Sequence, residues 1–207
     1  MLLAETIAKQ ARQPSGLLGR IVAWAMGHET SPENDRTVAL LEVTPHDRVL
    51  EVGFGHGRTI EKLARLATGG IIAGLDRSAA MLKVASARNR EAIAAGRVVL
   101  TTGDGASLPY PDTAFDKACA THVLYFWREP LQPLRELRRV LRPGGRLVLC
   151  VRDKRDAKRA GKYPPDIYRF YDRAELEMLV RQAGFRPVQY ASTTVSRREI
   201  AWLIAEV

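Results

Sequence analysis

The chain has 207 residues, of which 46% are hydrophobic and 27% charged, and its formal net charge at pH 7 is +9. A chain of this length can bury a full core, which predicts one domain over residues 1–207. No apolar run reaches the roughly 18 residues of a membrane-spanning helix, and the N-terminal residues lack the basic start and cleavage site of a secretory signal. We therefore expect a cytoplasmic protein without a transmembrane segment.

Helical and strand-like segments alternate along most of the chain. The residues before Pro45 have helical periodicity, and five strand-like runs follow at 48–53, 70–76, 97–104, 115–121 and 146–151, with helical patterns between them. The helix before the fifth strand is expected to end at Gly144. Strands that alternate with helices predict βαβ units, a parallel sheet and right-handed crossovers.

The C-terminal third begins with a polar stretch. We expect a loop from residue 152 to about Tyr171. Asp172 then starts a helix, because Glu175 three residues later completes the pattern of a capping box. Two further strand-like runs close the chain, at 186–195 and 199–207.

The two cysteines and the basic clusters have simple interpretations. Cys119 and Cys150 each lie in an apolar strand-like run and are expected to be reduced core residues, with neither a disulfide nor a metal site.

Arginines at 135–146 lie on the polar face of an amphipathic helix. The second basic cluster, at 152–162, leaves two alternatives open: solvated surface, or a surface that binds nucleic acid or an anionic membrane.

Three glycines follow the first strand in VLEVGFGHGRT, at Gly53, Gly55 and Gly57. Glycine lets the backbone turn sharply and approach a ligand without a Cβ in the way. Asp76 ends the second strand, where a carboxylate can accept hydrogen bonds from both hydroxyls of a ribose. Asp104 ends the third strand, and its carboxylate and a neighbouring N–H can bind an adenine edge. These strand ends predict a site for a nucleotide-like cofactor.

The spacing of the glycines distinguishes between two such cofactors. A dinucleotide fingerprint, G-x-G-x-x-G, needs its third glycine at the position that Arg58 occupies. No tyrosine is followed four residues later by lysine, so the short-chain reductase signature is also missing. Glu51, inside the strand, can instead hold an α-ammonium group, which S-adenosylmethionine has and NAD lacks.

Five segments in this order resemble the class I S-adenosylmethionine-dependent methyltransferases, and among these the broad small-molecule branch of the methyltransferase type 11-like proteins. The segments are VLEVGFGHG, GLDRSAAML, GDGASLPYPDTAFD, HVLYFW and LRELRRVLRPGGRLVL. The resemblance implies a Rossmann-like, doubly wound α/β fold in three layers, with a seven-stranded, mostly parallel sheet whose last strand is antiparallel. His56 departs from the family pattern, which often has a small residue or proline there.

The resemblance also implies which residues hold S-adenosylmethionine. The methionyl part would be held by Glu51, Gly53, Gly55 and Gly57, and the ribose by Asp76. The adenine would be held by Asp104 and Gly105, with Arg77 and Met81 beside it. Phe54 and Thr121 are expected to contact the cofactor as well.

On this basis the domain divides into four parts. They are an N-terminal helical cap (1–44), a cofactor-binding core (45–151), a substrate-side loop (152–171) and a C-terminal helix with a strand pair (172–207). We expect the cap and the loop to cover the acceptor side, because the core strands leave it open and methyl transfer requires that water be excluded.

The end of the fourth strand, ATHVLYFW, is the expected place for catalytic chemistry. A general base is needed only where the methyl acceptor carries a proton of high pKa. His122 is the candidate for that base, and the alternative is a histidine that lines the pocket and positions the substrate. Tyr125, Phe126 and Trp127 are expected to be core or pocket wall.

Missing motifs narrow the acceptor. The residues after the fourth strand lack the Asp-Pro-Pro-Tyr type of motif used for base amino groups, the Pro-Cys pair used for cytosine carbon, and an acidic cluster for magnesium. The predicted function is therefore methyl transfer to a small molecule. Two alternatives stay open: an RNA or protein methyltransferase that uses the basic segment 152–162, and an NAD(P)-dependent oxidoreductase or non-catalytic nucleotide binder on the same fold.

Overall fold

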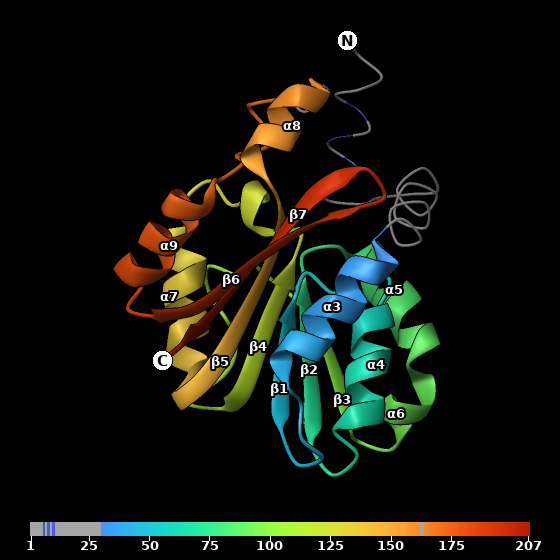
Figure 1. Ribbon diagram of the computed structural model, residues 1–207. Coiled ribbons are helices and arrows are strands. Elements are labelled where there is room, and N and C mark those ends of the chain that lie inside the picture. Colours follow the sequence, from blue (N-terminus) through green and yellow to red (C-terminus); the bar gives the residue numbers. More distant parts are fainter. Residues whose placement is uncertain (1–5, 7, 9, 11–29, 162–163) are drawn as a thin grey trace.

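A computed structural model of the protein describes residues 6, 8, 10, 30–161 and 164–207. At its centre is one sheet with the strand order β3-β2-β1-β4-β5-β7-β6 (Figure 1). The seven strands are β1 (Arg48–Val52), β2 (Ile71–Asp76), β3 (Val98–Thr102), β4 (Phe115–Thr121), β5 (Leu141–Arg152), β6 (Arg186–Val195) and β7 (Arg198–Glu206). The first five are parallel, and β7 is antiparallel to both of its neighbours. The predicted α/β fold with an antiparallel last strand is confirmed.

Helices cover both faces of this sheet and make the three layers (Figure 1). On one face lie α3 (Ser31–Leu41), α4 (Arg58–Leu66), α5 (Ala79–Arg88) and α6 (Arg90–Ala94), and on the other lie α7 (Leu131–Val140) and α9 (Arg173–Gln182). Successive residues of a strand point to opposite faces, so Val49 packs in the cluster with Ile60 of α4 while Leu50 packs with Leu134 of α7. Because helices cover both faces, residues that point in either direction are buried, which explains why the strands are continuous apolar runs.

The fifth strand is longer than predicted. It begins at Leu141 instead of residue 146, and the preceding helix ends at Val140 instead of Gly144. Pro143 disfavours helical backbone at the residue before it and cannot donate to a helix, so the helix stops early. The residues that follow form an irregularity in the pairing of β4 with β5, in which Gly144 has a φ of 73°.

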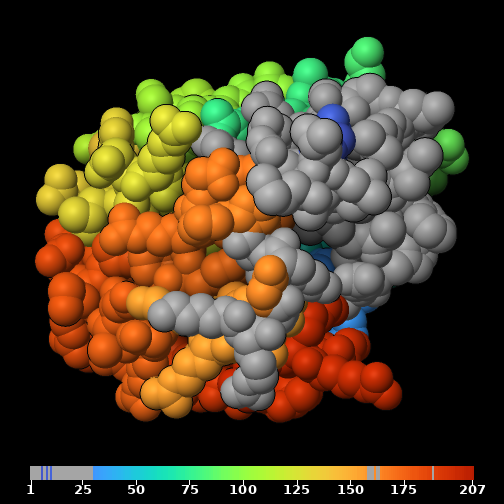
Figure 2. Space-filling model, turned by 90° about the horizontal axis from the view of Figure 1, so that it is seen from above, coloured from blue at the N-terminus to red at the C-terminus, as the bar shows by residue number. Residues whose placement is uncertain are grey.

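The segment predicted as a polar loop contains a helix, α8 (Lys154–Ala160), so that prediction is wrong for these residues. Asp153 explains the difference, because its carboxylate accepts from the Arg155 N–H at 2.7 Å and its carbonyl accepts from the Ala157 N–H at 3.0 Å, so it caps the start of α8. Seen from above, residues of this segment occupy the middle of the molecular face, next to the C-terminal hairpin (Figure 2). The residues before Pro45, predicted to be helical, include α3, and most of residues 1–29 lie outside the described part.

The helix predicted to start at Asp172 is confirmed in detail. The Asp172 carboxylate accepts from the Glu175 N–H at 3.0 Å, and the Glu175 carboxylate accepts from the Asp172 N–H at 2.8 Å. These bonds satisfy two donors that a helix leaves unpaired at its start. Among the described residues, no helix is both long and apolar enough to cross a membrane.

Both cysteines belong to the core between the sheet and α3, as expected. Cys119 and Cys150 are fully buried on the neighbouring strands β4 and β5, and no disulfide joins them. Burial raises the pKa of both thiols well above the ordinary value, so neither thiol is a ready nucleophile.

Candidate active site

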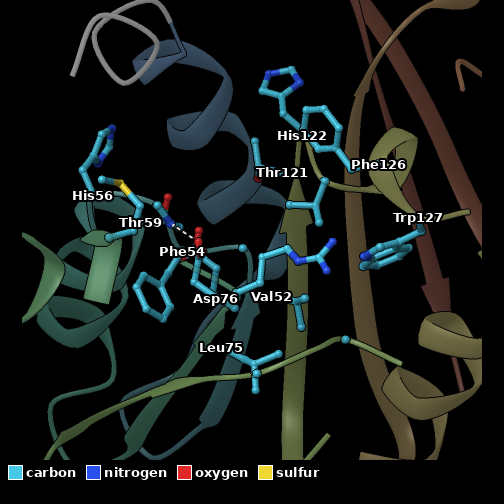
Figure 3. Close-up of a pocket in the computed structure, with 18 of the residues that line it drawn as sticks. Val52, Phe54, His56, Thr59, Leu75, Asp76, Thr121, His122, Phe126 and Trp127 are labelled. Atoms are coloured by element: carbon cyan, nitrogen blue, oxygen red, sulfur yellow. Dashed lines mark hydrogen bonds between the residues drawn. The ribbon is translucent and has the colours of Figure 1, made fainter. Parts of the chain in front are cut away.

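A cavity opens at the edge of the sheet where the parallel strands end. Its walls come from the ends of β1, β2, β3 and β4, the first turns of α3 and α4, and helix α5 (Figure 3). All of the site residues predicted from the sequence line it except Gly57, namely Glu51, Gly53, Phe54, Gly55, Asp76, Arg77, Met81, Asp104, Gly105, Thr121 and His122. The remaining lining residues are Thr30, Asn34, Val52, His56, Thr59, Leu75, Gly103, Val123, Phe126 and Trp127.

The three glycines after β1 have left-handed backbones but different surroundings. A Cβ on Gly53 would lie 2.2 Å from a methyl group of Val123, so this glycine permits close packing against the residues after β4. A Cβ on Gly55, whose φ is 50°, would meet no atom within 4 Å. Gly57 starts α4 and packs against Ala85 and Asn89 behind the loop, so it does not line the cavity as predicted. Gly55 is therefore the glycine that leaves room for a ligand.

Asp76 holds the glycine loop in place as well as lining the cavity. One carboxylate oxygen accepts from the Gly55 N–H at 2.9 Å, and the other accepts from the Ser78 N–H at 2.9 Å. Figure 3 shows Asp76 below the loop, close to Phe54. Burial raises the pKa of this carboxyl, and the two backbone bonds counteract part of the rise. Each oxygen keeps a lone pair with which it can accept from a bound hydroxyl.

Glu51 is the most perturbed acid of the cavity. Its side chain is buried at the end of β1, and burial raises its pKa to about 8 despite a hydrogen bond from Thr59. Oxygen Oε2 has no hydrogen-bond partner in the described structure. A buried carboxylate oxygen without a donor is costly, and a bound ammonium group would supply both the donor and the compensating charge. The site thus fits the α-ammonium group of S-adenosylmethionine.

The end of β3 adds a more exposed acid. The Asp104 side chain is 58% exposed, accepts from the Ala106 N–H at 3.0 Å and lies 3.6 Å from the Arg77 guanidinium. Gly105 follows it, and a Cβ there would be 3.5 Å from the ring of Trp127. We call Glu51, Asp76 and Asp104 the carboxylate wall of the cavity.

The opposite side is aromatic and follows β4. We call His122, Val123, Phe126 and Trp127 the aromatic wall; Figure 3 shows His122, Phe126 and Trp127 across the cavity from Phe54 and Asp76. The Phe126 ring packs against Tyr168 with ring centroids 4.9 Å apart, so the segment after α8 supports this wall.

Helix α3 belongs to the segment 1–44 that was expected to cover the acceptor side, but none of its residues at the cavity was predicted individually. Thr30 and Asn34 line the cavity, and the buried carboxylate of Glu33 contacts the His122 ring. The letters SPEND predict only a helix start, because proline and an acid are common in a first turn. Nothing in the local sequence shows that this turn meets a histidine 89 residues further on.

Comparisons with known proteins agree with this geometry. A family model described as "Methyltransferase domain" matches residues 50–149. The chain is 31% identical over 181 residues to demethylmenaquinone methyltransferase of Thermotoga maritima, an alignment that covers 86% of this chain and 74% of that protein. It is 30% identical over 168 residues to 27-O-demethylrifamycin SV methyltransferase of Amycolatopsis mediterranei, covering 76% of this chain and 61% of the relative.

The fold is also similar to that of solved methyltransferase structures. A solved structure of geranyl diphosphate methyltransferase in complex with S-adenosylmethionine superposes with a TM-score of 0.73 at 16% identity, covering 93% of this chain and 92% of the other. The alternative of an oxidoreductase or a non-catalytic nucleotide binder is not retained. The chain belongs to the S-adenosylmethionine-dependent methyltransferases, and its cofactor is S-adenosylmethionine.

Proposed function

We propose that the protein transfers a methyl group from S-adenosylmethionine to a small, ring-containing organic acceptor. The aromatic wall carries this proposal. Val123, Phe126 and Trp127 offer apolar surface after β4, and Figure 3 shows Phe126 and Trp127 across the cavity from Phe54 and Asp76. Such walls bind flat apolar groups by burial and ring packing, whereas a charged polymer needs cations along its path.

The basic segment does not favour a nucleic-acid acceptor. Arg152 is paired with Asp156 at 2.5 Å, and Lys154 is paired with Glu175 of α9. These acids compensate cations that an RNA-binding surface would direct at phosphates. Two cations of this segment are thus neutralised within the protein, which weakens the case for the runner-up function, methylation of RNA or protein. That function is an outcome of the test below.

Two relatives agree with a ring-containing acceptor. By their names, one acts on a demethylated rifamycin and the other on demethylmenaquinone. The chain spans 61% of the length of the first and 74% of the second, so their acceptors are a guide to chemical class only.

The chemistry asked of the protein is modest. The cofactor supplies a methyl group already activated by a sulfonium. The chain has to hold the acceptor in line with that group and keep water out. In our proposal the glycine loop and the carboxylate wall fix the cofactor, and the aromatic wall orients the acceptor.

The test is transfer of tritium from methyl-labelled S-adenosylmethionine to a cell extract that has been separated by size. We expect label in the small-molecule fraction, in compounds retained by an apolar column. Asp76→Ala serves as the inactive control and Asp35→Asn, a change of an exposed carboxylate on α3, as the active control. Label confined to RNA or to protein would overturn the proposal and establish the runner-up.

A further inference from the structure

Glu33 is a fully buried carboxylate in the first turn of α3. Its Oε2 hydrogen-bonds His122 Nε2 at the end of β4, and its Oε1 lies 3.4 Å from the Arg198 guanidinium at the start of β7. The N-terminus of a helix also favours negative charge. A buried carboxylate costs several kcal/mol unless it is compensated. Here a guanidinium, an imidazole ring and a helix terminus converge on one carboxylate.

The backbone of His122 is held in an unusual conformation. Its φ is 59°, in the left-handed region that few residues other than glycine adopt. The His122 N–H donates to the Cys150 carbonyl at 2.9 Å, which ties this residue to β5. Such strain persists only where the surroundings impose it, and it is concentrated at functional sites. The ring is thus fixed from both ends, by β5 at its backbone and by Glu33 at Nε2.

The contact with Glu33 decides which ring nitrogen can take up a proton. An ionised carboxylate only accepts hydrogen bonds, so Nε2 carries the hydrogen in the neutral ring and Nδ1 carries the lone pair. Nδ1 is buried and has no hydrogen-bond partner in the described structure. Among the described residues, Arg198 lies 3.4 Å from Glu33, and the Tyr125 ring centroid is 6.1 Å from that of His122. A buried nitrogen left without a donor requires an explanation, and a protic ligand provides one.

We propose that Glu33 is a positioning residue that keeps His122 in the Nε2–H form, so that Nδ1 takes the proton from a hydroxyl-bearing acceptor. This inference rests on the proposed function and names the acceptor class more closely. As the oxygen–carbon bond forms, the sulfur–carbon bond of the cofactor's methyl group breaks and its electron pair stays on sulfur. The hydroxyl proton moves to Nδ1, and the Glu33 carboxylate offsets the charge of the imidazolium until the proton passes to water.

The decisive measurement is the tautomer of His122 in ligand-free protein labelled with ¹⁵N-histidine. Long-range proton–nitrogen spectra distinguish Nε2–H from Nδ1–H, and the His122→Asn variant identifies the signal. We expect the Nε2–H form in the wild type and in Glu33→Asp, and loss of that preference in Glu33→Gln, whose amide can also donate. An Nδ1–H form in the wild type would overturn the proposal whatever the acceptor proves to be.

Activity supplies the second readout. Transfer to the small-molecule fraction should fall about tenfold or more in Glu33→Gln, with partial rescue in Glu33→Asp. S-adenosylhomocysteine affinity, measured by calorimetry, should stay within about twofold, which shows that the variant is folded. Asp35→Asn on the same helix, where Asp35 pairs with Lys62, should change neither readout. Transfer at the wild-type rate by Glu33→Gln would refute the role of Glu33 in positioning His122. Label found only in macromolecules would refute the small-molecule acceptor but would not affect the tautomer result.

Discussion

The two walls of the cavity are built in different ways. The carboxylate wall consists of strand ends, and each of its acids lies within a few residues of a turn that the local sequence specifies. The aromatic wall depends on segments that are distant in the chain: α3 contacts His122, and Tyr168 supports Phe126. The first wall can be recognised in a single sequence, whereas the second is defined only by tertiary packing.

This difference matters for function. A cofactor shared by a whole family can be held by one conserved backbone arrangement at the ends of parallel strands. An acceptor that differs between family members must be bound by parts that vary independently of the sheet. The variants below test whether the walls act separately, starting with the largest expected effect.

Gly55→Val should abolish binding of S-adenosylhomocysteine while the protein stays folded. The new side chain would enter space that is empty within 4 Å of its Cβ, which is where we place the methionyl group. The left-handed backbone, with φ at 50°, should cost about 1–2 kcal/mol of stability in addition. Calorimetry gives the affinity and thermal unfolding gives the stability.

Gly96→Val is the matched control, because Gly96 has a φ of 71° and equally open surroundings but lies between α6 and β3, away from the cavity. It should show the same loss of stability and normal binding. Normal binding by Gly55→Val would mean that the loop does not contact the cofactor.

Asp76→Ala should weaken S-adenosylhomocysteine binding about 100-fold, because two hydrogen bonds to a charged acceptor are lost at about 1.5–3 kcal/mol each before relaxation. The loop should loosen too, since Asp76 accepts from the Gly55 N–H. Asp104→Ala, which removes a side chain that is 58% exposed, should cost less than about tenfold in the same assay. Equal effects would show that the ribose is not bound at Asp76.

Binding should depend on pH through Glu51. Its pKa is about 8 in the ligand-free protein, so a bound ammonium group expels the proton, and affinity should rise about tenfold per pH unit from about pH 6 towards 8. Glu51→Gln should flatten this rise. The free energy of unfolding should depend on pH in the opposite direction, because Glu51 holds its proton more tightly in the folded state than in the unfolded state. Wild-type stability should therefore fall as the pH rises from about 4.5 to 8, whereas the stability of Glu51→Gln should not show this fall.

Phe126→Ala should have the smallest effect on the cofactor. It removes a ring from the aromatic wall and its contact with Tyr168, so methyl transfer to the small-molecule fraction should fall. The dissociation constant of S-adenosylhomocysteine should change by less than about twofold if the walls act separately. A loss of affinity like that of Asp76→Ala would show that both walls bind the cofactor.

Much of the fold was predictable because strand, turn and cap signals agree along the chain. The capping box at Asp172 and the β-strand ending at Asp76 are as predicted. The predictions failed where two signals compete: glycines at 144 and 145 suggested a helix end, but Pro143 ends the helix earlier. The polar composition of α8 suggested a loop, and composition does not show that Asp153 caps a helix by accepting from the Arg155 N–H.

The candidate site divides in the same way. Glu51, Asp76 and Asp104 were found because parallel strands end at one edge of a sheet, so position along the chain gives position in space. Gly57 packs against Ala85 of α5 and does not line the cavity, because spacing alone cannot tell a glycine that faces a ligand from one that faces a helix. Glu33 was missed because its partners are distant in the chain: His122 follows β4, and Arg198 begins β7.

The order of the last two strands has a consequence for biosynthesis. β7 follows β6 in the chain but lies between β5 and β6 in the sheet, so β6 leaves the ribosome before the strand with which it pairs. The two strands must therefore insert together as a hairpin next to β5. Arg198 is the first residue of β7 and reaches Glu33 only after that insertion. The residues of the glycine loop are therefore synthesised long before Arg198, and the contact between Arg198 and Glu33 is among the last of the described contacts that a nascent chain can form.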